Sequence, residues 1–224
     1  MAINLPHVVA SRLTPPAVER LAAAIAVDPS LAPSLVNAAL PTVLAVFAGA
    51  AATPSGAQRL AEEIGARGGR ALEDLDATVP ASAPGSGARL LSSHLGDAGL
   101  SRIAVVLSRL TGARTDQAQA TLDRLTIVAL GALAGQDPAI WRSGQALADF
   151  FAGQREAIRQ AMPAGLASVL AGLGLPGISK VAASTGPVDD RRTVDAPTPL
   201  RPTAPLGEQE VAHAPRAVTT PTDA

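Results

Sequence analysis

The chain has 224 residues, enough for one sizeable domain and a tail, and its hydrophobic content of 47% is sufficient for a core. A net charge of −1 excludes a global field that would draw nucleic acid or an anionic membrane. The chain contains no cysteine, which excludes disulfides, thiolate metal sites and cysteine nucleophiles. Aromatic residues make up only 2%, so the core must be built from alanine, leucine and valine, which favours close-packed helices over a β-sandwich.

The first part of the chain alternates helix-start signals with apolar stripes. Leu5–Leu13 predicts a short leading helix, and Thr14-Pro15-Pro16 is a cap followed by prolines in the first turn of the next. Ser30 is predicted to cap a third helix, whose apolar face is Leu35, Ala39, Val43 and Phe47. Pro41 lies inside that helix and is predicted to kink it.

The second part repeats this pattern. Leu40–Gly49 is matched by Leu125–Ala134, 85 positions further along, and Val18, Leu21 and Ile25 are matched at the same spacing by Ile103, Val106 and Leu110. We therefore predict an all-α, multi-helix bundle made from two related helical repeats, about 14–76 and 97–162, joined by a linker at 77–88. Neither repeat covers its own apolar central helix, so the two are expected to share one core, with Phe47 and Leu133 both inside it.

Further helix signals complete the predicted domain, which spans residues 1–175. Thr53-Pro54 and Asp137-Pro138 each combine a cap with proline and predict helix starts. A short helix is predicted at Arg89–Leu95 and is expected to end at Gly96. Asp97 is predicted to cap the next helix, which ends at Gly112. Thr115 is predicted to cap the long helix that runs through Leu133. Helices around Gly144–Gly153, Arg155–Met162 and Pro163–Ala171 are expected to follow.

Residues 176–224 are rich in proline and threonine and poor in large apolar residues. Such a segment cannot bury enough surface to offset the entropy cost of ordering, so a disordered tail is predicted. At the other end, residues 1–13 lack the basic region of a signal peptide, which favours a cytoplasmic protein. Two apolar stretches, 31–52 and 122–135, permit a membrane-associated or envelope protein as the alternative, although full burial in a soluble core explains both.

Several of these motifs resemble a known bacterial family. Ala39–Ala57 is similar to the "LLPALLGGLA…TPEGA" stretch of DUF937 domains, and Leu110–Ala118 with Ile127–Ala134 is similar to their second half. Ala146–Ile158 and Pro163–Leu170 resemble an extension found in members that are fused to an OmpA-like domain. No OmpA-like domain is recognised in this sequence. The resemblance implies an all-helical fold, distantly similar to YidB-like proteins, of unknown function and without catalytic residues to carry over.

Residue patterns that carry chemistry are few, and each has a structural explanation. Gly172–Gly177 matches G-x-G-x-x-G, but a dinucleotide site needs a strand before it and a helix after it. His7, His94 and His213 have no second ligand at metal spacing, and the adjacent acids Glu62-Glu63, Glu73-Asp74 and Asp189-Asp190 point about 100° apart on a helix. The arginines that could contact phosphate, Arg59, Arg67, Arg70, Arg102, Arg109 and Arg114, are interleaved with acids and lack an aromatic platform.

The sequence therefore predicts no catalytic, cofactor-binding or metal-binding residue, no cofactor and no small-molecule substrate. Two hypotheses remain. The first is a non-enzymatic protein-interaction module that binds a protein partner or itself through a groove between its two halves. The second is an envelope- or membrane-associated structural protein that uses the apolar helices. Nucleic acid is the least favoured partner.

Overall fold

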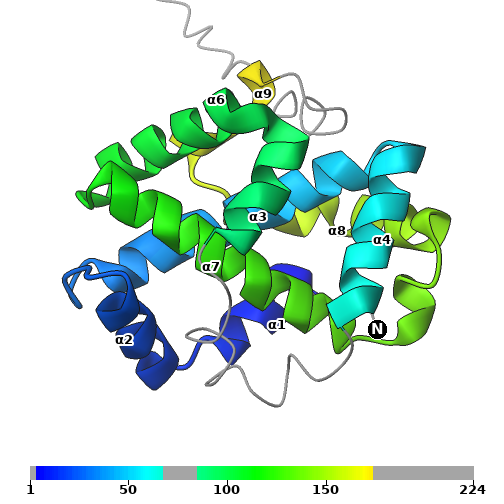
Figure 1. Ribbon diagram of the computed structural model, residues 1–224, viewed down its shortest axis with the longest axis horizontal. Helices are drawn as coiled ribbons and strands as arrows, with labels where there is room; N and C mark the ends of the chain where they lie inside the picture. The colour runs from blue at the N-terminus through cyan, green and yellow to red at the C-terminus, as the bar shows by residue number, and fades with distance from the viewer. Residues whose placement is uncertain (1–3, 68–84, 174–224) are drawn as a thin grey trace, which may run out of the picture. The chain divides into compact units, whose positions relative to one another are not determined.

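The structure is a computed structural model that describes residues 4–67 and 85–173, all of them within the unit Met1–Gly186. Every regular element in these residues is a helix, as the sequence predicts (Figure 1). In chain order the elements are α1 (Leu5–Arg12), α2 (Pro15–Ala24), α3 (Ala32–Ala51), α4 (Pro54–Arg67), α6 (Ser86–Thr111), α7 (Thr115–Ala134), the 3₁₀ helix η2 (Pro138–Ile140), α8 (Gly144–Ala161) and α9 (Ala164–Gly172).

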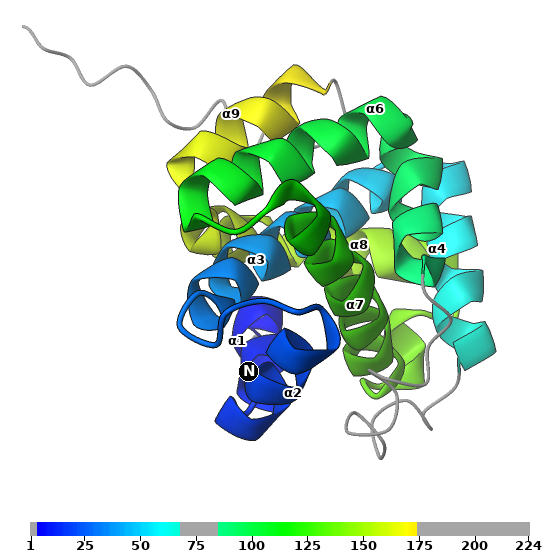
Figure 2. The ribbon, with the colours of Figure 1, turned by 60° about the vertical axis from the view of Figure 1, so that its left-hand side comes forward.

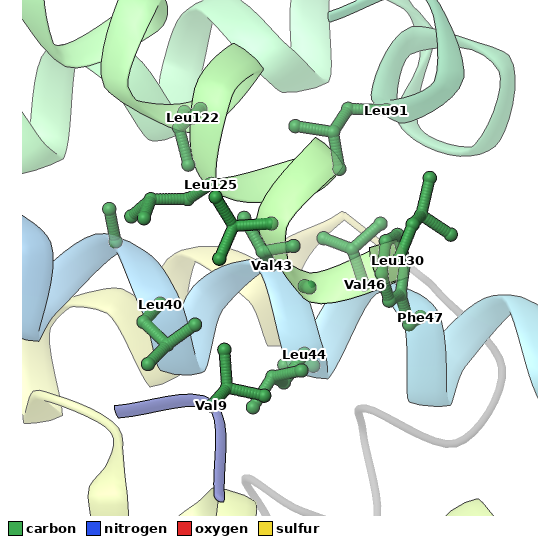
Figure 3. Packing of buried hydrophobic residues seen from close by; sticks show 14 of the residues in the cluster. Val9, Leu40, Val43, Leu44, Val46, Phe47, Leu91, Leu122, Leu125 and Leu130 are labelled. Atoms are coloured by element: carbon green, nitrogen blue, oxygen red, sulfur yellow. The ribbon is translucent and has the colours of Figure 1, made fainter. Parts of the chain in front are cut away.

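The centre of the fold is formed by α3 and α7, which are 20 residues long each and pack against one another. They contain the two matching apolar stretches, and Figure 3 shows side chains of both, such as Val43 and Leu125, pointing into one cluster. Phe47 and Leu133 are fully buried in the same core, which confirms that prediction. All four residues of the predicted apolar face of α3 are likewise completely buried.

The remaining helices cover this pair from different sides. α6 lies along α7 and also contacts α3, while α8 packs against α3, α4 and α1 (Figures 1 and 2). The buried face of α8 repeats at helical spacing and consists of Leu147, Phe151, Gln154 and Ile158. α2 contacts α3, and α9 contacts α6.

A predicted helix cap is found in the structure where the capping side chain bonds to an amide of its own helix turn. Thr53 precedes α4, and its hydroxyl oxygen accepts a hydrogen bond from the Gly56 amide at 3.2 Å. The prediction for Ser30 is wrong, because its amide and hydroxyl both donate to the Asp28 carboxylate, at 2.8 and 2.7 Å, and α3 begins two residues later. A hydrogen bond to a charged carboxylate is stronger than one to a neutral group, so the Ser30 side chain stabilises the turn before α3 and does not cap the helix. Thr115 is the first residue of α7, and Arg114 occupies the cap position.

The entry into α6 differs from the predicted linker. Residues 68–84 lie outside the described residues, but 86–88 already belong to the first turn of α6. They are held there by Asp123 of α7, whose carboxylate accepts from the Gly85 amide at 3.0 Å and the Ala88 amide at 2.8 Å. This side chain satisfies amides that a helix start leaves unpaired. The linker prediction is therefore wrong for 86–88.

Two further boundaries concern glycine and proline. The predicted helix end at Gly96 is confirmed, because two helical segments of α6 meet there at a kink, where φ is +70° and ψ is 160°, non-helical values that favour glycine. Gly112 ends α6 as predicted. α3 continues through Pro41 as one element.

The second half of the described chain also differs from the prediction in two places. Asp137-Pro138 begins only the short η2, and the two helices predicted within Gly144–Met162 are one continuous α8, capped by Ser143. The short apolar helix predicted after it is α9. The predicted tail, residues 176–224, lies outside the described residues.

Candidate functional site

An apolar groove of about 350 Å³ lies where α1, α2 and α3 meet. α3 supplies the floor over its first half, α2 supplies one wall, and the end of α1 supplies the other. The residues that line it are Ala10, Leu13, Pro15, Val18, Glu19, Pro29, Ala32, Pro33, Val36, Asn37 and Leu40. This volume falls at the lower end of the range typical of ligand-binding clefts.

The polar side chains of the groove are Glu19 and Asn37, one on each side of the apolar floor. Both are exposed, and neither side chain makes a hydrogen bond or ion pair with another described residue. Leu13 and Val18 are only half-buried, so apolar surface remains open to solvent between them. A mostly apolar cleft with a few polar groups at its edge has the character of a binding site.

The loop between α2 and α3, which forms one end of the groove, is held in a defined conformation. Ala26 has a φ of +52°, a left-handed conformation that costs energy for a residue with a side chain. Its carbonyl accepts a hydrogen bond from the Gln117 side-chain amide of α7. Two residues on, the hydrogen bonds from Ser30 hold the pKa of the Asp28 carboxyl below its usual value. This end of the groove is therefore held in place by hydrogen bonds within the protein.

A second opening, also of about 350 Å³, lies between α4 and the first part of α6. Most of the residues that line it are charged or polar; the lining consists of Arg59, Glu62, Glu63, Ala66, Leu90, Ser93 and His94. The Nε2 atom of His94 is buried there without a hydrogen-bond partner, and burial together with the nearby Arg59 lowers the pKa of this histidine. The Ser93 hydroxyl is already used, because it donates to the Leu90 carbonyl at 2.7 Å.

Within residues 4–67 and 85–173, no group of three or more histidine and acidic side chains is arranged to hold a metal ion. Gly172, the first glycine of the G-x-G-x-x-G match, ends α9, and the match runs on outside the described residues. Glu62 and Glu63 are exposed, as predicted. Arg102 and Arg109 are exposed on α6, and the guanidinium of Arg114 pairs with Asp116. His213, Arg70, Glu73-Asp74 and Asp189-Asp190 also lie outside the described residues.

The family model for DUF937, described as a bacterial protein of unknown function, matches residues 7–136, more than half of the chain. The chain belongs to the DUF937 family. No curated protein and no solved structure matches it. The match covers most of α1, every element from α2 to α7 and the whole apolar groove, whereas α8 and α9 follow it. In this DUF937 protein the groove is thus part of the family domain.

Sequence reasoning missed both the groove and two side chains that join distant parts of the DUF937 protein. Asp123 caps α6 from α7, and the buried Gln154 of α8 accepts a hydrogen bond from the Leu5 amide at 2.8 Å, at the start of α1. Pro15, which lines the groove, was interpreted only as part of a helix-start signal. Nothing in the local sequence marks Asp123 or Gln154, because their partners lie 35 to 149 residues away.

Proposed function

We propose that this DUF937 protein is a non-enzymatic interaction module that binds a helical segment of a partner protein in the groove between α1, α2 and α3. The observation that carries the proposal is the groove itself, which is lined mainly by apolar residues, is partly open, and ends at a loop held by hydrogen bonds within the protein. The sequence predicted a groove between the two halves of the chain. The opening that joins the halves, between α4 and α6, is lined mainly by charged and polar residues, and the groove lined mainly by apolar residues lies within the first half.

The geometry of the groove floor suits a helix. Its residues on α3 follow at helical spacing from Ala32 to Leu40 and form one stripe about 12 Å long, at a rise of about 1.5 Å per residue. That length corresponds to about two turns of a partner helix. Helices that bind in grooves use apolar anchors spaced by three, four and seven residues, which span a similar distance.

The absence of an enzymatic role is supported by the chemistry of the two openings. The apolar groove is lined by one carboxylate and one amide, without a nucleophile beside a base or a second acid. In the α4–α6 opening, His94 lies next to an arginine that disfavours its protonation, and the neighbouring serine hydroxyl is bonded to the backbone. Neither arrangement resembles an activated nucleophile or a general acid–base pair.

Site-specific photo-crosslinking in the native host tests the proposal. A photoreactive amino acid at Val18, in the groove, should give a discrete protein adduct, whereas the same group at the exposed Gln160 of α8 should not. Adding Ala10→Trp, which fills the groove from the exposed side of α1, should abolish the adduct. An adduct that persists with Ala10→Trp, or equal adducts at both positions, would refute the groove as the binding site.

The alternative is membrane or envelope association. α3 is 20 residues long with a mean hydropathy of 1.7, so by length and composition it qualifies as a membrane span, but 89% of that window is buried within the protein. Core helices of soluble proteins meet the same criteria, and we therefore propose a cytoplasmic location. Cell fractionation distinguishes the two, because a pellet that resists carbonate extraction favours the membrane alternative.

A further inference from the structure

We infer that the α1–α2–α3 groove selects a partner helix that carries a lysine or arginine beside its apolar anchors. This inference rests on the proposed function and adds the chemistry of the partner. It follows from which polar groups border the groove. Hydrogen-bond acceptors and negative charge border it, and the backbone donors usually present at helix starts are reduced in number.

The acceptors come from two helices. Glu19 of α2 places a carboxylate at the groove edge, and no described residue pairs with it. On α3, Asn37 contributes its side-chain amide, and its backbone carbonyl lacks the usual helical donor because Pro41, four residues later, has no N–H. Arginine and lysine side chains bring donors without any acceptor, so they match this edge.

Prolines at the helix starts explain why few backbone N–H donors face the groove. The start of a helix normally presents free amides and a partial positive charge, which attract anions. α2 begins with Pro15-Pro16, and α3 has Pro33 in its first turn, so the amides at these groove-lining starts are reduced in number. An anionic ligand therefore finds few donors at the groove.

The end of α1 acts in the same direction. Ala10 and Leu13, at its C-terminal turn, line the groove, and the free carbonyls of a helix C-terminus carry partial negative charge. Arg12, in the same turn, is exposed and does not line the groove. The groove thus combines an apolar floor with edges that favour a cation.

Binding of synthetic helices to the full-length protein tests this inference. Three fluorescently labelled, alanine-based peptides of about 14 residues share one leucine stripe and differ at a single flanking position, which is lysine, glutamine or glutamate. Fluorescence anisotropy at low ionic strength should rank lysine above glutamine above glutamate. The lysine peptide should bind about two- to fivefold more tightly than the glutamine peptide, as expected for an exposed ion pair.

Variants assign the preference to the groove. Glu19→Gln should remove most of the charge preference, and Asn37→Arg should reverse it, while Glu62→Gln, an exposed acid on α4 outside the groove, should change nothing. Ala10→Trp should abolish binding of all three peptides. The circular dichroism spectrum of each variant checks that it is folded.

The possible failures differ in what they refute. If all three peptides bind equally and Ala10→Trp still blocks them, the groove binds helices without charge selection, and this inference is wrong while the proposed function stands. If Ala10→Trp has no effect, or if no peptide binds, the groove is not a helix site, and both are wrong. A preference for glutamate would overturn the inference alone.

Discussion

The two halves of α3 have different surroundings. From Ala38 to Ala51 every residue is buried, enclosed by α4, α6, α7 and α8, whereas Pro33, Ser34 and Asn37 in the first half are exposed. Figure 3 shows the enclosed half, in which Val46 and Phe47 lie beside Leu91 of α6 and Leu130 of α7. One helix is thus both the centre of the core and the floor of the groove.

This difference arises from the neighbours of the helix. The groove beside the first half of α3 is bordered by residues of the short α1 and α2, and Pro33 and Asn37 of its lining remain exposed. The enclosed half is sealed by longer helices and by side chains that reach across the chain, such as Asp123. Substitutions of buried residues in either half of α3 should therefore act on stability, and those of exposed residues in the groove should act on binding.

The largest expected effect is in the enclosed half. Phe47→Ala should lower the free energy of unfolding by about 3–5 kcal/mol, because the side chain is fully buried and its loss leaves a cavity. Leu133→Ala, in the matching part of α7, should cost about 2–5 kcal/mol. Chemical denaturation measures both, and an unchanged midpoint in both variants would show that these helices are not the core.

The next effect concerns the side chain that holds α6 against α7. Asp123→Ala leaves the amides of Gly85 and Ala88 without a partner in a largely buried place, which should cost about 1–3 kcal/mol. Asp97→Ala provides a matched control, because that aspartate is exposed and should change stability by less than about 0.5 kcal/mol. Equal effects of the two substitutions in chemical denaturation would contradict the capping role of Asp123.

The contrast between Asp123 and the other caps shows what can be predicted from the sequence. Thr53 acts within its own turn, so its role follows from the residues beside it. The apolar periodicity of α3 and α7 is also local, and it predicted both helices and their burial. Asp123 and Gln154 have hydrogen-bond partners far along the chain, so the residues beside them do not reveal their roles. The Ser30 hydroxyl donates to the Asp28 carboxylate, and this hydrogen bond competes with the capping role predicted from the residue type alone.

The groove was unpredictable for a related reason. Its lining comes from three helices, and its openness depends on where α1 and α2 end relative to α3. Periodicity assigns Val18 to an apolar face, which suits a core and a groove equally well. Only the packing of the three helices decides that some of this surface stays open.

A smaller effect is expected where α4 meets α6. Burial and Arg59 lower the pKa of His94 in the folded protein, so between that lowered pKa and the usual value of about 6.5 the unfolded chain binds more protons. Stability should therefore fall as the pH drops through this window. Melting temperatures measured from pH 7.5 to 5.5 should decline less for His94→Gln than for the unchanged protein, and parallel curves would show that His94 does not titrate as described.

The smallest effect is expected in the groove half of α3. Asn37→Ala removes an exposed side chain that makes no hydrogen bond to a described residue, so stability should change by less than about 0.5 kcal/mol. Leu35→Ala, two positions away on the same helix but fully buried, should cost about 2–5 kcal/mol. Chemical denaturation of both variants distinguishes the buried residue that supports the fold from the exposed residue at the groove, although both lie within one turn of α3. A large loss for Asn37→Ala would mean that this asparagine supports the fold and would remove the reason for treating it as part of a binding surface.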